Sequence, residues 1–221
     1  LFSFSAFQKM LFPFEVLGTI AFAISGILAA DRRDMDLVGV FTVACTTAFG
    51  GGTIRDLILD RSPVYWIEHS ALPASILVLC IASRFVGLSQ RIPPGSRILT
   101  LADAVGLGVF SATGALVAAG TGTSLFIAAL LGVVTGTFGG VLRDIICNDV
   151  PILFRKETLY ATCALAGSTV TLAIDHYTID QTTLAITAGT TTVTLTRLLA
   201  LKFNWRLTRP PKKKPAPPPR D

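Results

Sequence analysis

Apolar residues are grouped along the chain into seven long runs, and short segments between the runs hold most of the charged residues. The runs cover residues 12–30, 37–59, 71–86, 98–119, 124–146, 158–174 and 182–201, of which the third and sixth are short. About 17 to 25 apolar residues suffice for a helix to cross a bilayer, whereas a membrane strand would alternate polar and apolar residues. The pattern therefore predicts an all-α integral membrane protein with seven transmembrane helices.

Composition agrees with this class and limits the function. Hydrophobic residues make up 51% of the chain and charged residues 15%, with a mean hydropathy of +0.63, whereas soluble domains carry about 25% charged residues. Little sequence lies outside the runs, so we expect the function to lie within the membrane and no enzyme activity. The four cysteines and two histidines are scattered, so we predict no metal site, no disulfide and no cofactor, and we expect no nucleic-acid partner.

An internal duplication is visible at a shift of 88 residues, which relates one repeat at residues 12–90 to a second at residues 98–175. Glu15 falls on the acidic Asp103. Six identities lie in one short window, where unrelated sequences would give about one: Gly51, Gly52, Arg55, Asp56, Ile58 and Pro63 match Gly139, Gly140, Arg143, Asp144, Ile146 and Pro151. Each copy has three runs, so the second must enter the bilayer from the opposite side. We predict two inverted three-helix repeats, a seventh helix at residues 181–202 and a disordered basic tail at residues 203–221.

Basic residues of the connecting segments predict the orientation. With arginines inside the runs set aside, one side of the membrane holds Lys9 and Arg61 alone, and the other holds Arg32, Arg33, Arg84, Arg91, Arg97, Arg155, Lys156 and the basic residues of the tail. Basic loops stay in the cytoplasm. We therefore expect a multi-pass protein of a prokaryotic plasma membrane with its N-terminus outside and its C-terminus in the cytoplasm.

Two stretches combine glycines with an Arg-Asp pair inside an apolar run. They are Gly50, Gly51, Gly52, Arg55 and Asp56 in the second run and Gly139, Gly140, Arg143 and Asp144 in the fifth. If glycines break these helices, free carbonyls for a permeant K⁺ lie near Gly50–Gly52 and Gly139–Gly140, which is tolerable only along a polar cavity. Close helix packing is the alternative role for the glycines.

Charged residues at membrane depth usually face the bundle and find a partner. The predicted topology brings Glu15 to the same end as Arg55, and Asp103 to the same end as Arg143. We predict the ion pairs Glu15–Arg55 and Asp103–Arg143, with Asp56 and Asp144 as second partners. These pairs have two possible roles, which are compatible with each other. They lock the fold, or they flank a polar pathway and gate it.

These motifs, with Asp103-Ala-Val-Gly-Leu-Gly-Val-Phe110, resemble the prokaryotic branch of the TRIC family, the trimeric intracellular cation channels, over roughly residues 12–202. The resemblance implies a homotrimer in which each subunit has a pore for monovalent cations, chiefly K⁺, lined by kinked second and fifth helices. It assigns the kinks to Gly50–Gly52 and Gly139–Gly140. The second copy departs from the first because Phe138 stands where Gly50 does, and the lysine-centred lipid motif of animal members has no match.

Two other functions remain open. Some bacterial relatives of this domain are described as transporters of small amino acids, so a secondary transporter of a small zwitterion such as glycine is the second candidate, with its carboxylate bound at Arg55 or a helix N-terminus. A membrane scaffold without transport is the third. A scaffold has no need for buried Arg-Asp pairs in both copies of the repeat.

Overall fold

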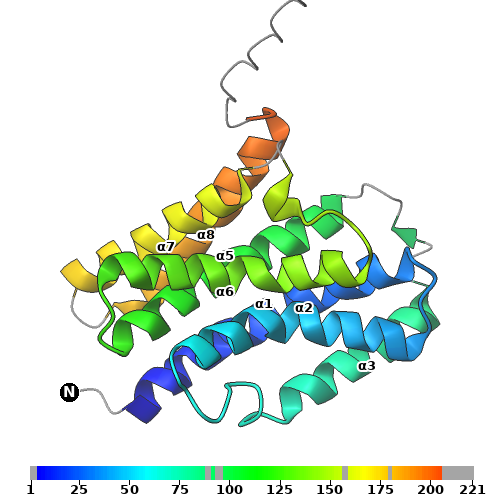
Figure 1. Ribbon diagram of the computed structural model, residues 1–221, viewed down its shortest axis with the longest axis horizontal. Coiled ribbons are helices and arrows are strands. Elements are labelled where there is room, and N and C mark those ends of the chain that lie inside the picture. The colour runs from blue at the N-terminus through cyan, green and yellow to red at the C-terminus, as the bar shows by residue number, and fades with distance from the viewer. Residues whose placement is uncertain (1–3, 88–90, 93–96, 156–158, 179–180, 206–221) are drawn as a thin grey trace, which may run out of the picture.

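The computed structural model describes residues 4–87, 91–92, 97–155, 159–178 and 181–205, and this part of the chain is all helical (Figure 1). Its seven α-helices, followed in each case by their bounds, are α1 (Phe4–Asp31), α2 (Leu37–Ile58), α3 (Ala71–Val86), α5 (Arg97–Gly120), α6 (Leu125–Ile146), α7 (Tyr160–Tyr177) and α8 (Thr182–Lys202), with a 3-10 turn η1 (Ile152–Phe154) before α7. Each predicted run contains one helix, which confirms the all-α prediction. The one large difference in bounds is that α1 begins at Phe4.

Five of these helices are long and apolar enough to cross a membrane: α1, α2, α5, α6 and α8. The two others correspond to the runs that the sequence marks as short, and α3 has only 16 residues. The predicted tail lies almost wholly outside the described residues, as do Lys156 and residues 93–96 of the linker between the predicted repeats.

Helix ends repeat at the same 88-residue distance as the sequence. The α2 helix starts after the N-cap Asp36, whose side chain accepts a hydrogen bond from the Gly39 N–H at 2.8 Å, and α6 starts after Ser124, which caps the Ile127 N–H at 3.4 Å. After these helices, Asp60 and Asn148 have φ values of 51° and 55°, a left-handed conformation that Asp and Asn adopt more readily than most residues. The two copies therefore start and stop their central helices in the same way.

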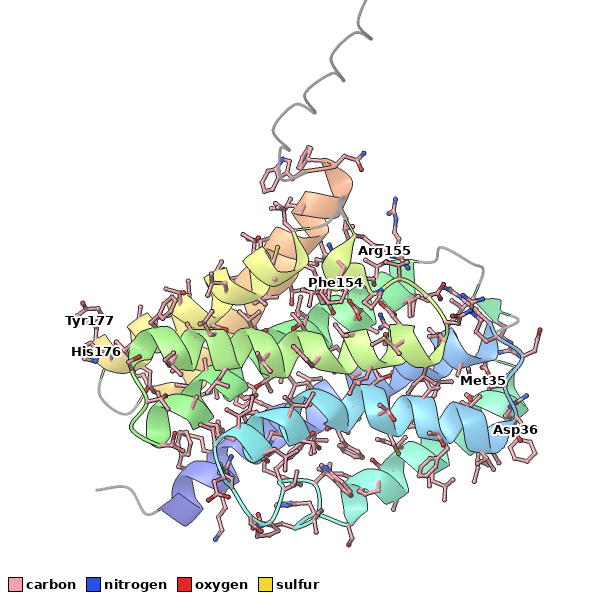
Figure 2. All side chains as sticks on the ribbon, in the orientation of Figure 1. Met35, Asp36, Phe154, Arg155, His176 and Tyr177 are labelled. Carbon is pink, nitrogen blue, oxygen red and sulfur yellow. The ribbon has the colours of Figure 1, made fainter. Side chains whose placement is uncertain are left out.

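The N-cap of α2 gives a first testable prediction. Asp36, labelled at one end of the bundle in Figure 2, is exposed, but it satisfies a helix N–H that has no partner within the helix. Asp36→Ala should lower the free energy of unfolding by about 1 kcal/mol, measured by SDS-induced unfolding in mixed micelles. Ser124→Ala is the control, and its effect should be smaller because its cap bond is longer. An equal loss in both variants would contradict this reading of the caps.

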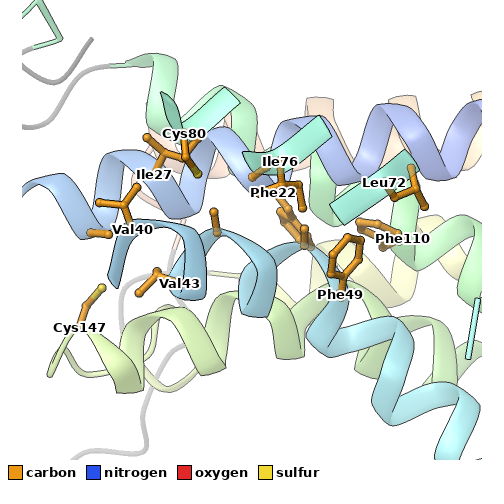
Figure 3. Close-up of a cluster of buried hydrophobic side chains, with 14 of the residues drawn as sticks. Phe22, Ile27, Val40, Val43, Phe49, Leu72, Ile76, Cys80, Phe110 and Cys147 are labelled. Atoms are coloured by element: carbon orange, nitrogen blue, oxygen red, sulfur yellow. The ribbon is translucent and has the colours of Figure 1, made fainter. Parts of the chain in front are cut away.

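Four helices, α1, α2, α5 and α6, form the centre of the bundle, and the other three lie at its flanks. α1 packs against α2 and α5, and α6 packs against α2 and α5. On one flank α3 covers α1 and α2, while α7 and α8 cover the other flank against α5 and α6 (Figure 1). An apolar cluster, which includes Ile27, Val43, Ile76 and Cys80, fills the space around α1, α2 and α3 (Figure 3).

The two phenylalanines that match at the 88-residue shift meet at the centre. The rings of Phe22 on α1 and Phe110 on α5 stack at 5.4 Å between centroids. Each ring lies over a glycine of the other helix, because a Cβ at Gly106 would come within 2.2 Å of Phe22 and a Cβ at Gly18 within 3.0 Å of Phe110. This exchange holds α1 and α5 together through two reciprocal contacts.

Candidate functional site

Two matching glycines of the motifs, Gly51 and Gly139, form the point where α2 crosses α6. A Cβ at Gly51 would lie 1.9 Å from the Thr135 carbonyl oxygen, and a Cβ at Gly139 would lie 2.1 Å from the Thr47 carbonyl oxygen. These contacts are again related by the shift of 88 residues. The backbones of the two helices therefore touch here, and only glycine permits that approach.

The predicted helix breaks at Gly50–Gly52 and Gly139–Gly140 are wrong. The α2 helix is continuous from Leu37 to Ile58, and α6 is continuous from Leu125 to Ile146. Carbonyls inside a continuous α-helix accept hydrogen bonds from its own N–H groups, so these segments do not offer the unbonded carbonyls that we expected for K⁺. The glycines serve the alternative role, close packing.

Arg143, on α6, is the centre of a buried ion cluster at one end of the bundle, hereafter the Arg143 end. Its Nη1 donates to Asp103 Oδ1 on α5 at 2.7 Å and also to the Ser25 hydroxyl on α1, and its Nε donates to Asp144 Oδ1 at 2.9 Å. Asp144 also accepts from the Ile152 N–H at 2.9 Å. The predicted Asp103–Arg143 pair and the second partner Asp144 are therefore both present, and the site joins α1, α5 and α6.

Two residues of this cluster were not predicted. Tyr160 on α7 lies with its hydroxyl near Gly140, and the guanidinium of Arg197 on α8 stacks 4.9 Å from the Tyr160 ring centroid. Both side chains are buried, and Arg197 Nη1 has no hydrogen-bond partner in the part of the chain that the structure describes. An arginine inside an apolar run was a visible signal for Arg197, whereas nothing in the pattern singled out Tyr160.

Arg55 forms the corresponding cluster at the opposite end, hereafter the Arg55 end. Its Nε donates to Asp56 Oδ1 at 2.8 Å, and its guanidinium lies 5.5 Å from the Tyr65 ring centroid. Asp56 also pairs with Arg61 at 3.2 Å and accepts from the Tyr65 N–H at 3.1 Å. Arg55 Nη2 lies 2.8 Å from Asp56 Oδ1 in the same ion pair, and within the described residues it has no hydrogen bond.

The predicted Glu15–Arg55 ion pair is absent from the part of the chain that the structure describes. Arg55 is held by its sequence neighbour Asp56 and by the Tyr65 ring instead, both of which approach from its own repeat. The two ends therefore differ. At the Arg143 end the ion pair crosses between helices, and at the Arg55 end it does not.

The two tyrosines occupy equivalent places although they are not 88 residues apart. Tyr65, from the segment between α2 and α3, lies against Gly52, while Tyr160 lies against Gly140, and these glycines do match. Burial raises the pKa of Tyr65, and its hydroxyl donates to the Ala48 carbonyl at 3.2 Å. Each cluster thus combines two acids, two arginines and one tyrosine.

The charges of the two clusters balance. Glu15 and Asp56 offset Arg55 and Arg61 at one end, and Asp103 and Asp144 offset Arg143 and Arg197 at the other. No group of three or more histidine, cysteine, aspartate or glutamate side chains in the described segments could hold a metal ion. The arrangement places neutral but strongly polar groups at both ends of an apolar bundle.

Comparisons with known proteins agree on one family. Residues 12–87 and 100–176 match the family model described as Glycine transporter. The chain is 36% identical to the TRIC trimeric intracellular cation channel orthologue from Rhodobacter sphaeroides, with a TM-score of 0.81 over 89% of this chain and 100% of that one. A prokaryotic TRIC channel solved in 0.5 M KCl gives 28% identity and a TM-score of 0.81 over 90% and 99%. The UPF0126 inner membrane protein YadS of Escherichia coli is 35% identical, over 87% of this chain and 92% of its own.

Proposed function

This chain belongs to the TRIC family of membrane proteins, which the glycine transporter model also matches, and from that membership we propose that it is a channel for monovalent cations, chiefly K⁺. The similar solved structures are cation channels, so the activity is passage across a membrane and not catalysis. The homologues are membrane proteins, one of them of the inner membrane.

The observation that carries this proposal is the charge compensation around the buried arginines. An uncompensated guanidinium beside the path would repel a cation. Arg143 lies between Asp103 and Asp144, and Arg55 lies on Asp56. A cation that passes either cluster therefore meets carboxylates together with the arginines.

The finer organisation is also part of the proposal. We take residues 12–90 and 98–175 as inverted repeats, because helix caps, glycine contacts and arginine clusters recur 88 residues apart. The N-terminus would lie outside and the C-terminus in the cytoplasm of a prokaryotic cell, on the distribution of basic residues. A homotrimer with one pore per subunit, lined by α2 and α6, follows the description of the Rhodobacter protein as trimeric and the central position of these helices.

A second function is favoured by two observations. The family model is described as a glycine transporter, and Arg55 is a buried guanidinium. A guanidinium binds a carboxylate well, so a zwitterion such as glycine is the competing substrate.

Current across planar bilayers under a KCl gradient, with glycine then added to one side, separates the two functions. We expect unitary openings that reverse near the K⁺ equilibrium potential and do not respond to glycine. Bilayers that received the same detergent without protein serve as the control. Saturable glycine uptake into liposomes from the same preparation, without unitary current, would contradict the channel and support the transporter.

A further inference from the structure

The segment between α2 and α3, residues 61–70, folds back so that one of its side chains enters the bundle at the Arg55 end (Figure 1, cyan), and it is hereafter called the strap. That side chain is Tyr65, which is 5% exposed. Its ring contacts Phe49 on α2 and Phe110 on α5 edge to face, at 6.2 and 6.5 Å between centroids. Tyr65 therefore stands between helices of both predicted repeats.

Gly52 on α2 is the seat of the Tyr65 ring. A Cβ at Gly52 would lie 2.4, 3.1 and 3.3 Å from three atoms of this ring, which are its three nearest neighbours. The ring also lies 5.5 Å from the Arg55 guanidinium, so it covers that arginine. Tyr65 thus occupies the space beside α2 that a side chain at position 52 would fill, next to the charged groups of the Arg55 end.

Three side-chain hydrogen bonds hold the strap in this position. Asp56 accepts from the Tyr65 N–H at 3.1 Å, and the Tyr65 hydroxyl donates to the Ala48 carbonyl at 3.2 Å. Trp66 Nε1 donates to the Thr53 hydroxyl at 3.0 Å. The Ala48 carbonyl lies inside a continuous helix and the Thr53 hydroxyl also donates within α2 at 2.8 Å. Both acceptors therefore keep a bond in α2 when the strap leaves.

The matching segment after α6 is built differently. Asp144 also accepts from a backbone N–H, but from Ile152, which is one residue earlier in the matched register, and the residue that matches Tyr65 is Leu153. The tyrosine on the matching glycine at that end, Tyr160, belongs to α7. At the Arg55 end alone, within the described residues, the aromatic ring is carried by a connecting segment, which can move while the helices stay in place.

We propose that the strap is a gate, in which Tyr65 seated on Gly52 closes the Arg55 end of the path and withdrawal of the strap opens it. The inference rests on the proposed channel function, because a gate presumes a path. Withdrawal frees the glycine face of α2 and uncovers Arg55 together with Asp56, a compensated pair that does not repel a cation as a lone guanidinium would.

Gly52→Ala tests the gate, because its methyl group takes the place of the Tyr65 ring. The nearest neighbours of this methyl group are ring atoms of one side chain and not the backbone of another helix, and alanine favours α2. In planar bilayers under a KCl gradient, we expect the open probability to rise several-fold over that of the wild type. Gly120→Ala, whose Cβ would have nothing within 4 Å, is the control and should behave as the wild type.

Tyr65→Ala removes the ring itself and is the second test. It should raise the open probability as Gly52→Ala does, and the double variant should add nothing further, because both substitutions act on one contact. Wild-type open probability in both single variants, or additive effects, would overturn the gate and leave the channel standing. Absence of current from the wild type and from every variant would instead refute the channel, and the gate with it.

Fluorescence of Trp66 follows the strap independently of current. The chain has two tryptophans, Trp66 and Trp205, so Trp205→Phe leaves one reporter on the strap. Trp66 is half-buried and its ring stacks on Phe49 at 5.2 Å. In this background Gly52→Ala should make quenching of Trp66 by iodide several-fold stronger, and Gly120→Ala should not. A higher open probability without stronger quenching would contradict the proposal, because the path would then open with the strap in its seat.

Discussion

Asp103→Asn should lower the free energy of unfolding by about 3–5 kcal/mol, because it leaves the charges of a buried cluster unbalanced. The Asp103 carboxylate lies 2.7 Å from Arg143 Nη1, and both side chains are nearly inaccessible. After the substitution, Asp144 alone faces the two arginines of this end. Asparagine keeps the size and one oxygen of aspartate, so packing changes little and the loss reports the charge. SDS-induced unfolding in mixed micelles measures it.

Glu15→Gln is the matched control for this substitution. Glu15 stands 88 residues before Asp103, but it forms no ion pair with Arg55 within the described residues. Neutralising it removes no direct partner, so we expect less than half the loss that Asp103→Asn causes. Equal losses would mean that Glu15 supports Arg55 in solution as Asp103 supports Arg143. The conclusion that only the Arg143 end has an ion pair between helices would then be wrong.

The sequence was sufficient for the helices because their length and apolar character follow from the membrane itself. Hydropathy predicted all seven, and the 88-residue repeat predicted which glycines and arginines correspond. The Asp103–Arg143 pair was also predictable, since a buried charge must find an opposite charge and the topology offered one. Arg55 did not follow the same rule, because it is held by Asp56 and the Tyr65 ring and forms no ion pair with Glu15 within the described residues.

The predictions were wrong where the role of a residue depends on which side chains or backbone atoms it contacts in the folded structure. Composition identified the glycines but not their contacts, so a helix break and a close crossing could not be distinguished. Tyr65 and Tyr160 lie on matching glycines but come from positions that do not match in sequence, one before α3 and the other at the start of α7. Aligning the two repeats does not reveal such a pair, because the two side chains contact matching glycines but come from sequence positions that do not align.

Gly51→Ala should be among the most damaging small substitutions in the protein, with a loss of about 3 kcal/mol or more in the free energy of unfolding. The new Cβ would lie 1.9 Å from the Thr135 carbonyl oxygen and 2.9 Å from its carbonyl carbon, and backbone atoms of α6 cannot rotate away. The two helices must separate, which disturbs the centre of the bundle. Gly139→Ala, with a Cβ 2.1 Å from the Thr47 carbonyl oxygen, should cause a similar loss. The same unfolding assay measures both.

Gly50→Ala is the control that separates this crossing from a general need for glycine. A Cβ there comes within 2.6 Å of Leu142 Cδ1, the movable end of a side chain, and its next contact is 3.8 Å away. Alanine also favours a helix over glycine by about 1 kcal/mol, so the net change should be small. The chain itself carries Phe138 at the corresponding place in α6, which fits a position that tolerates a side chain. If Gly50→Ala were as damaging as Gly51→Ala, the motif would need its glycines for bending and not for the contact with Thr135.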